Sequence, residues 1–125
     1  MNDLIIAKGE KTPCIEFYAN GELRIEGRSA PENSVEFYQS VAAWLNDFVE
    51  TIPVKTTLHV KLEYFNSSSS KAIFSLFKQL EQIEKAGFET SVYWYNEKDD
   101  ADMLEAGHYY KKVIKLPFYF ANLEN

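Results

Sequence analysis

The sequence predicts a single α/β domain in which helices pack against one mixed β-sheet. Three short segments with the apolar pattern of strands come first, and helical and strand patterns alternate after them. Short strands joined by tight turns pair antiparallel, whereas strands separated by a helix pair in parallel, so both kinds of pairing are expected in one sheet. The chain of 125 residues shows no internal repeat and no linker, and we expect one domain over residues 1–125.

The N-terminal strands are predicted at Leu4–Lys8, Cys14–Tyr18 and Glu22–Glu26. Asn20-Gly21 is a strong signal for a hairpin turn between the second and the third segment, because both residues tolerate the positive φ of a tight turn. Leucine and isoleucine alternate with charged residues in the third segment, as is typical of a strand with one buried face.

A first helix is predicted to follow these strands. Ser29 and Glu32 have the spacing of a capping box, and Pro31 is tolerated in a first turn. We expect Pro53 to end the helix, because proline lacks the backbone N–H that a helix interior needs. The core-facing stripe is predicted to contain Tyr38, Val41, Ala42, Leu45, Phe48 and Val49.

A long strand and a second helix are predicted in the middle of the chain. Apolar, β-branched and aromatic residues from Thr56 to Phe65 indicate the strand. An apolar pattern at helical spacing begins at Ile73, and Gly87 is a natural cap for the C-terminus of that helix. The buried face of the helix is predicted to contain Ile73, Leu76, Phe77, Leu80 and Ile83.

The last third of the chain continues the alternation of strands and helices. Phe88–Tyr95 is rich in aromatic residues and is predicted to be a strand. Asp99–Glu105 is predicted to be a short acidic helix that stops at Gly107. Lys112–Leu116 is predicted to be the last strand, before Pro117.

Charge and cysteine content argue against several classes of protein. Thirteen basic and nineteen acidic residues give a net charge of −6, which disfavours nucleic acid as a partner, because a phosphate backbone needs a cationic face. The single cysteine, Cys14, cannot form an intrachain disulfide, and the two histidines lack the spacing of zinc ligands. The apolar run Leu4–Ala7 is too short for a signal or membrane segment, so a cytoplasmic protein without a cofactor is expected.

The acidic helix offers a candidate site for a divalent cation. Asp99 and Asp102 would share one helix face and could bind such an ion together. The segment lacks the spacing and the central glycine of a calcium loop, and acidic residues in a first turn complement the helix dipole without any metal. We therefore expect no metal site there.

The most informative segment is the serine run Ser67–Ser70, which lies between Asn66, where the predicted strand ends, and Lys71. A helix start needs one capping hydroxyl, which Ser68 or Ser69 can supply. The surplus hydroxyls lie where free backbone N–H groups and the helix dipole favour an anion such as phosphate. Either a phosphorylated ligand binds there, or one of the serines itself carries the phosphate.

Three other interpretations of the serine run stay open. The run can be a plain helix cap with a polar approach. Ser68 and Lys71 match the S-x-x-K pattern of penicillin-interacting serine enzymes, although the S-D-N and K-T-G elements of those enzymes are missing and their chains are larger. Asn66-Ser67-Ser68 also forms an N-glycosylation sequon, which would require secretion.

The succession of strand, Asn66, serine and helix resembles the STAS domain of anti-sigma-factor antagonists, in which an acidic residue precedes a regulatory phosphoserine at a helix start. A closer resemblance is to the SiaC family of bacterial regulatory phosphoproteins, and it implies a STAS-like α/β domain. The segments that carry it are Gly27–Asn33, Leu62–Lys71 and Asp99–Gly107, with Leu116-Pro117-Phe118 near the end. Together they extend the resemblance over essentially the whole chain.

The resemblance implies a partner-switching protein rather than an enzyme. Family members are phosphorylated by a histidine-kinase-like serine/threonine kinase and dephosphorylated by a type-2C protein phosphatase. The unphosphorylated form binds and activates a diguanylate cyclase, which promotes biofilm formation. The family's phosphoacceptor directly follows the asparagine and so falls on Ser67, where the family usually has threonine. The residues that would surround the phosphosite and face the partner are Asn66, Ser68, Ser69, Ser70 and Lys71.

Two functional hypotheses of different classes follow. The first is a non-enzymatic interaction module that is switched by phosphorylation of Ser67. The second is a sensor domain that binds an anionic or phosphate-bearing small molecule at the Ser67–Ser70 helix start. A third hypothesis, a small hydrolase that uses Ser68 and Lys71, would be supported by labelling with a serine-reactive fluorophosphonate or a penicillin.

Overall fold

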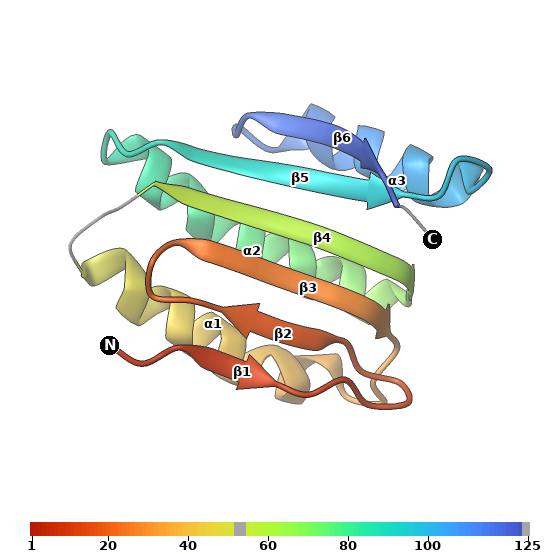
Figure 1. Cartoon of the computed structure of the whole chain (residues 1–125), viewed down its shortest axis with the longest axis horizontal. Coiled ribbons are helices and arrows are strands. Elements are labelled where there is room, and N and C mark those ends of the chain that lie inside the picture. The colour runs from red at the N-terminus through yellow and green to blue at the C-terminus, as the bar shows by residue number, and fades with distance from the viewer. Residues whose placement is uncertain (52–54, 124–125) are drawn as a thin grey trace.

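The computed structural model describes residues 1–51 and 55–123, in which six strands form one sheet with three helices packed against it (Figure 1). The elements are β1 (Leu4–Ile6), β2 (Cys14–Phe17), β3 (Glu22–Ser29), α1 (Ser34–Glu50), β4 (Thr56–Phe65), α2 (Ser67–Lys85), β5 (Thr90–Asn96), α3 (Ala101–Val113) and β6 (Phe118–Asn122). The predicted α/β class with a mixed sheet is confirmed. Within the described residues, no helix is both long enough and apolar enough to cross a membrane.

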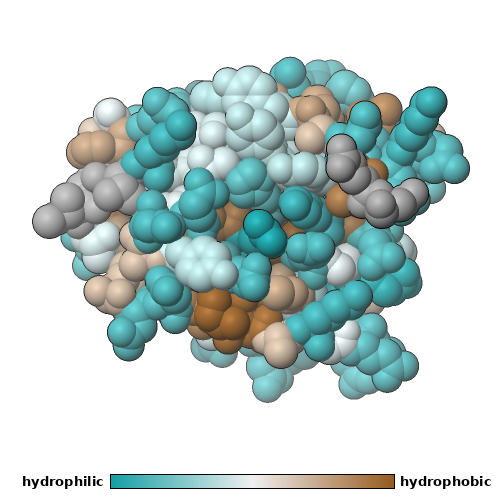
Figure 2. Space-filling model, viewed as in Figure 1, coloured by the Kyte–Doolittle hydropathy of each residue, from teal (hydrophilic) through white to brown (hydrophobic). Residues whose placement is uncertain are grey.

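The order of the strands in the sheet follows their order in the chain, from β1 to β6. The pairs β1–β2 and β2–β3 are antiparallel, and the pairs from β3 to β6 are parallel. From β3 onward, each pair of neighbouring parallel strands is connected by a crossover that contains one helix. Because such crossovers are right-handed, α1, α2 and α3 all lie on one face of the sheet (Figure 1). Figure 2 looks onto the opposite face, which is mostly hydrophilic apart from a hydrophobic area near β1.

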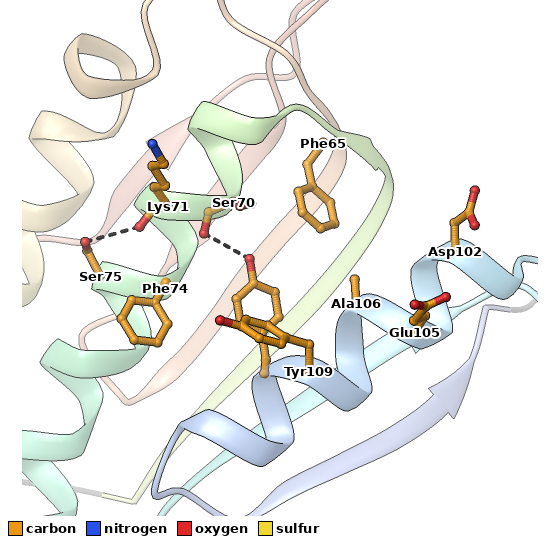
Figure 3. Close-up of a pocket in the computed structure, with 10 residues that line it drawn as sticks. Phe65, Ser70, Lys71, Phe74, Ser75, Asp102, Glu105, Ala106 and Tyr109 are labelled. Carbon is orange, nitrogen blue, oxygen red and sulfur yellow. Dashed lines mark hydrogen bonds between the residues drawn. The ribbon is translucent and has the colours of Figure 1, made fainter.

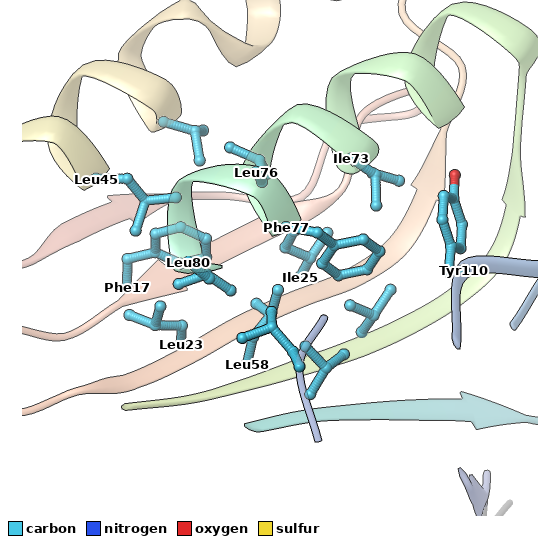
Figure 4. Close-up of a cluster of buried hydrophobic side chains, with 14 of the residues drawn as sticks. Phe17, Leu23, Ile25, Leu45, Leu58, Ile73, Leu76, Phe77, Leu80 and Tyr110 are labelled. Carbon is cyan, nitrogen blue, oxygen red and sulfur yellow. The ribbon is translucent and has the colours of Figure 1, made fainter. Parts of the chain in front are cut away.

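The hydrophobic core lies between the sheet and the helices (Figure 4). Side chains alternate between the two faces of each strand, so that Leu58 and Val60 of β4 point inward while His59 lies on the uncovered face. All five apolar residues predicted for α2 are buried. The α1 stripe is also confirmed, with Ala42 and Val49 only partly buried. Periodicity alone therefore identified the core faces of both long helices.

The predicted start of α1 is wrong. Ser29 is the last residue of β3 and is buried, so it does not cap the helix. The cap is Asn33, whose side-chain Oδ1 accepts a hydrogen bond from the backbone N–H of Glu36 at 3.1 Å. Pro31 consequently precedes the helix instead of lying in its first turn. The helix ends at Glu50, and the predicted stop at Pro53 lies outside the described residues.

The sequence had suggested that Gly107 stops the acidic helix. That prediction is wrong, because Gly107 lies inside α3 and is buried. Glycine is needed there for close packing. A Cβ atom at this position would lie 2.6 Å from a ring carbon of Phe120 and 2.6 Å from one of Trp94. The Nε1–H of Trp94 also donates a hydrogen bond to the carbonyl of Met103 at 2.9 Å, which holds α3 against the sheet. The small residue lets the helix approach the strands, and the helix continues past it.

The last strand also differs from the prediction. Lys112–Leu116 covers the end of α3 and the connection after it, and the strand is Phe118–Asn122. Two apolar residues of the connection, Ile114 and Leu116, are buried without joining the sheet. The backbone N–H of Lys115 donates instead to the buried carboxylate of Glu81 in α2 at 2.7 Å. Burial alone would raise the pKa of Glu81, but this hydrogen bond and Lys78 outweigh it and lower the pKa.

The packing at Gly107 gives a prediction about stability. On an exposed helix surface, a glycine-to-alanine change stabilises a protein by about 1 kcal/mol. We expect Gly107→Ala to have the opposite sign and to destabilise the fold by about 1–3 kcal/mol, because the new methyl group would overlap the rings of Trp94 and Phe120. Urea unfolding of the two proteins measures the difference. A stability equal to or above that of the wild type would contradict the close approach of α3.

Candidate functional site

The candidate site is built around Asn66, at the junction of β4 and α2. Its backbone N–H donates to the carbonyl of Ser29 at 3.0 Å and thereby continues the pairing of β4 with β3 by one residue. Its side-chain Oδ1 accepts hydrogen bonds from the backbone N–H of Ser69 at 2.9 Å and from the hydroxyl of Ser68 at 3.2 Å. Asn66 is therefore the N-cap of α2, and the expectation that Ser68 or Ser69 would supply the cap is wrong.

The four serines form the first turn of α2 and have unequal environments. Ser67 and Ser68 are exposed, Ser70 is half-buried, and Ser69 has an exposed fraction of 0%. The hydroxyl of Ser69 accepts a hydrogen bond from the hydroxyl of Ser29 at 2.8 Å and lies 3.2 Å from that of Ser34. The sequence run thus contains one residue that belongs to the interior of the protein.

A chain of hydroxyl groups extends from Ser69 into the core. Ser29 is also hydrogen-bonded to the phenol of Tyr38 at 2.6 Å, and Ser34 is hydrogen-bonded to Ser68 at 2.8 Å. Burial raises the pKa of Tyr38 to about 12, so the phenol keeps its proton at neutral pH. We call Ser29, Ser34, Tyr38 and Ser69 the hydroxyl network. It joins the end of β3 and the start of α1 to the start of α2.

Ser67 differs from its neighbours in combining an exposed side chain with an unengaged hydroxyl. Among the residues that the structure describes, no hydrogen bond to its Oγ is formed, whereas the hydroxyl of Ser68 bonds to Asn66 and Ser34. Ser67 is exposed at the carboxyl end of a parallel strand, where ligands and partners of α/β sheets commonly bind. The hydroxyl of Ser70 also has no partner among the described residues, but Ser70 is half-buried, so that of the four serines Ser67 is the one that is both exposed and unengaged.

The hydrolase and metal hypotheses receive no support from the geometry. The hydroxyl of Ser68 is hydrogen-bonded to Asn66 and Ser34, with no contact to Lys71 among the described hydrogen bonds. Asp99 lies in the turn before α3 and so does not share a helix face with Asp102, as had been expected. In the described part of the chain, no group of three or more His, Cys, Asp or Glu side chains is placed to hold a metal ion.

A groove of about 780 Å³ lies beside the serine turn, between α2 and α3 (Figure 3). Its walls are mainly apolar, and its rims carry Lys71 on α2 and Asp102 and Glu105 on α3. The phenol of Tyr110 crosses from α3 to donate a hydrogen bond to the carbonyl of Ser70 at 2.9 Å. The apolar side chains of the groove belong to Phe65, Phe74, Ala106 and Tyr109.

The sequence did not indicate the hydroxyl network or the groove. Ser29 and Ser69 are 40 residues apart, and nothing in the local pattern shows that they meet. Ser29 ends its strand on the inward-facing side, and this small polar residue at a buried position was the one available signal. The groove depends on how α3 is rotated against α2, which the weak amphipathic pattern of α3 does not determine.

Comparisons with known proteins agree with the fold and extend the interpretation. Residues 6–123 match the family model described as SiaC family regulatory phosphoprotein. A protein of Pseudomonas aeruginosa strain UCBPP-PA14 is 29% identical over 119 residues, which is 94% of each chain. The structure of SiaC of P. aeruginosa has a TM-score of 0.90 at 29% identity, over 98% of this chain and all of the other.

A further solved structure shows SiaC in an assembly. It is the crystal structure of the P. aeruginosa diguanylate cyclase SiaD in complex with its activator SiaC. The SiaC chain there has a TM-score of 0.91 at 28% identity, over 97% of this chain and 100% of that chain. Apo-SiaC from the same organism has a TM-score of 0.88 at 30% identity, over 96% of this chain and 98% of that chain. The family model, which matches residues 6–123, covers the serine turn and all three helices.

The unequal serines give a second prediction about stability. Ser69→Ala removes a partner from two buried hydroxyls, and we expect it to destabilise the protein by about 1–3 kcal/mol. Ser67→Ala removes an exposed hydroxyl without a partner, and we expect a change within about 0.5 kcal/mol. Thermal or urea unfolding of both variants checks the contrast. Equal stabilities for the two variants would show that the hydroxyl network does not hold the turn.

Proposed function

Because the chain belongs to the SiaC family of regulatory phosphoproteins, we propose that phosphate on Ser67 switches its binding to a diguanylate cyclase. In this proposal the unphosphorylated protein binds and activates the cyclase, and the phosphorylated protein does not. A histidine-kinase-like serine/threonine kinase adds the phosphate, and a type-2C protein phosphatase removes it. The chain itself catalyses no reaction and acts through binding alone.

The single observation that carries this proposal is the exposed, unengaged hydroxyl of Ser67. A kinase must bring its ATP to an accessible hydroxyl that is free to attack. Ser69 is excluded by burial, and the hydroxyl of Ser68 is already hydrogen-bonded on two sides. Ser67 also follows Asn66 directly, at the position where the family carries its phosphoacceptor. Serine at this position accepts phosphate as threonine does.

The local structure can hold a phosphate without unfolding. A phosphoserine carries a charge of about −1.5 to −2, and a negative charge in the first turn of a helix interacts favourably with the helix dipole. Asn66 caps the helix as a neutral amide and so places no like charge beside the phosphate. The first turn of α2 also contains no acidic residue. The modification would therefore change the surface of the protein while leaving its fold in place.

The test is the effect of stoichiometric phosphate on partner binding. We expect phosphorylation of Ser67 by the cognate kinase to weaken binding at least tenfold. The partner to be tested is a diguanylate cyclase from the same cell, and calorimetry measures the affinity. Ser67→Ala should bind as the unmodified protein does, and Ser67→Asp should bind more weakly at an unchanged melting temperature. Aspartate has less charge and fewer acceptor oxygens than phosphate, so its effect should be the smaller one.

A matched control is Ser40→Asp, which adds the same charge at an exposed serine of α1. It should leave the affinity for the cyclase unchanged. The proposal fails if stoichiometric phosphate on Ser67 does not alter the affinity, or if the kinase modifies Ser67→Ala as readily as the wild type. Intact mass spectrometry of the protein purified from its own cell distinguishes the phosphorylation switch from the small-molecule sensor. A covalently bound phosphate would favour the switch. An anion that is seen only in native spectra and dissociates on denaturation would favour the small-molecule sensor.

A further inference from the structure

We propose that the free edge of β6 pairs with the β6 edge of a second copy of this chain, so that two sheets join into one across a two-fold axis. The surface is separate from the switch, because β5 lies between β6 and β4, at whose end Ser67 is found. The inference therefore does not rest on the proposed function, and neither depends on the outcome for the other.

The two edges of the sheet differ in how well they are protected from pairing (Figure 1). Natural edge strands avoid other strands by being very short or by carrying charged side chains. The edge strand β1 has only three residues, and Asp3 directly precedes it. The edge strand β6 has five residues, none of which is charged. In a chain with a net charge of −6, such an edge lets two copies approach without direct contact of like charges.

The backbone of β6 has groups that point away from the sheet. The carbonyl of Pro117 accepts a hydrogen bond from β5 at 2.9 Å, and the N–H of Leu123 donates one to β5 at 3.0 Å. Successive residues of a strand direct these groups to opposite sides, so those of Phe120 and Asn122 point outward. Among the described residues, no hydrogen bond from outside the sheet reaches them. Pro117 does not block this edge, because its missing N–H lies on the side of β5.

Burial selects the register in which two copies can pair. Phe118 also directs its backbone outward, but only 3% of this residue is exposed, so a second strand cannot reach it. The accessible groups belong to Phe120 and Asn122. An antiparallel pair then sets Phe120 of one copy opposite Asn122 of the other, and the two residues exchange both hydrogen bonds. Ala121 meets its own counterpart on the two-fold axis.

The side chains on the uncovered face of the sheet fit this register. The small side chain of Ala121 suits the axis, because residues of a pair without hydrogen bonds approach to about 4.5 Å between their Cα atoms. Tyr119 lies opposite Leu123 of the second copy, and cross-strand pairs of aromatic and aliphatic side chains stabilise a sheet. Tyr119 is 49% exposed, and its ring rests against that of Tyr93 with 5.1 Å between the centroids.

The helix side of the edge also offers apolar surface. The ring of Phe120 is only partly buried and lies against His108, with 4.5 Å between the centroids, and below the ammonium group of Lys111. Leu104 precedes His108 by one turn on the same face of α3 and is 37% exposed. A second copy would cover Leu104 and Phe120 together. Because the paired strands are short, we expect a weak dimer that forms at high concentration.

The first test is sedimentation of the full-length chain over a concentration series up to about 1 mM. We expect a monomer–dimer equilibrium that Tyr119→Lys weakens at least tenfold, because two like charges would face the joined edge. Asn122→Pro should weaken it as well, since it removes an outward N–H at a position where an edge strand tolerates proline. Ile5→Lys is the matched control, because Ile5 is 55% exposed on the other edge strand, and it should leave the equilibrium unchanged.

The second test examines the register by cross-linking. In a chain that carries Cys14→Ser, we expect Ala121→Cys to form a disulfide between two copies under mild oxidation. Residues that face each other in a pair without hydrogen bonds have the Cα separation that a disulfide requires. The covalent dimer should form at least tenfold faster than with Ile5→Cys in the same background.

Two results would overturn the proposal. The first is a chain that stays monomeric at every concentration, which would leave the β6 edge to a strand of another protein. The second is a dimer that Tyr119→Lys and Asn122→Pro do not weaken and that Ala121→Cys does not cross-link, because the copies would then meet elsewhere. Melting temperatures of all variants show whether each one is folded, and a loss of dimer in Tyr119→Lys with its fold retained supports the proposal.

Discussion

The hydrogen bonds of Asn66 determine the position of every other residue of the candidate site. Its backbone fixes the end of β4 to the end of β3, and its side chain fixes the first turn of α2. The hydroxyl network then joins this turn to the start of α1. Because the network holds Ser69 inward, Ser67 must face outward on the helix, two residues earlier. The exposure of one hydroxyl is thus a consequence of the burial of another.

The energies involved explain how a small modification can act on binding and spare the fold. A negative charge in the first turn of a helix changes stability by about 0.3–1 kcal/mol in the favourable direction. A hundredfold change in affinity corresponds to about 2.8 kcal/mol, and like charges brought together at an interface cost several kcal/mol. The phosphate therefore has its larger effect where a partner would approach. A neutral cap such as Asn66 helps to keep the two effects separate, because it adds no charge beside the phosphate.

The sequence predicted what depends on periodicity and failed where distant segments meet. The apolar spacing of α2 and the alternation along β4 were sufficient to identify the faces that form the core. The expectation that a glycine ends a helix failed at Gly107. A larger residue there would overlap the rings of Trp94 and Phe120, and no local sequence pattern reveals that contact. The position of Ser67 at a helix start could be predicted. Its difference from Ser69 could not, because it depends on Ser29, which is distant in the sequence.

The sequential order of the strands has a consequence for how the chain reaches its fold. Every strand pairs with the strand that precedes it in the chain, so no pairing has to wait for a distant segment to be synthesised. The two antiparallel pairings close short turns and carry a small loop-closure entropy, whereas each parallel pairing must close a connection that contains a whole helix and forms more slowly. The sheet can grow from its antiparallel N-terminal part by adding one helix and one strand at a time as the chain leaves the ribosome. In that order α3 is the last helix to dock, and the groove beside Ser67 is completed at the end of folding.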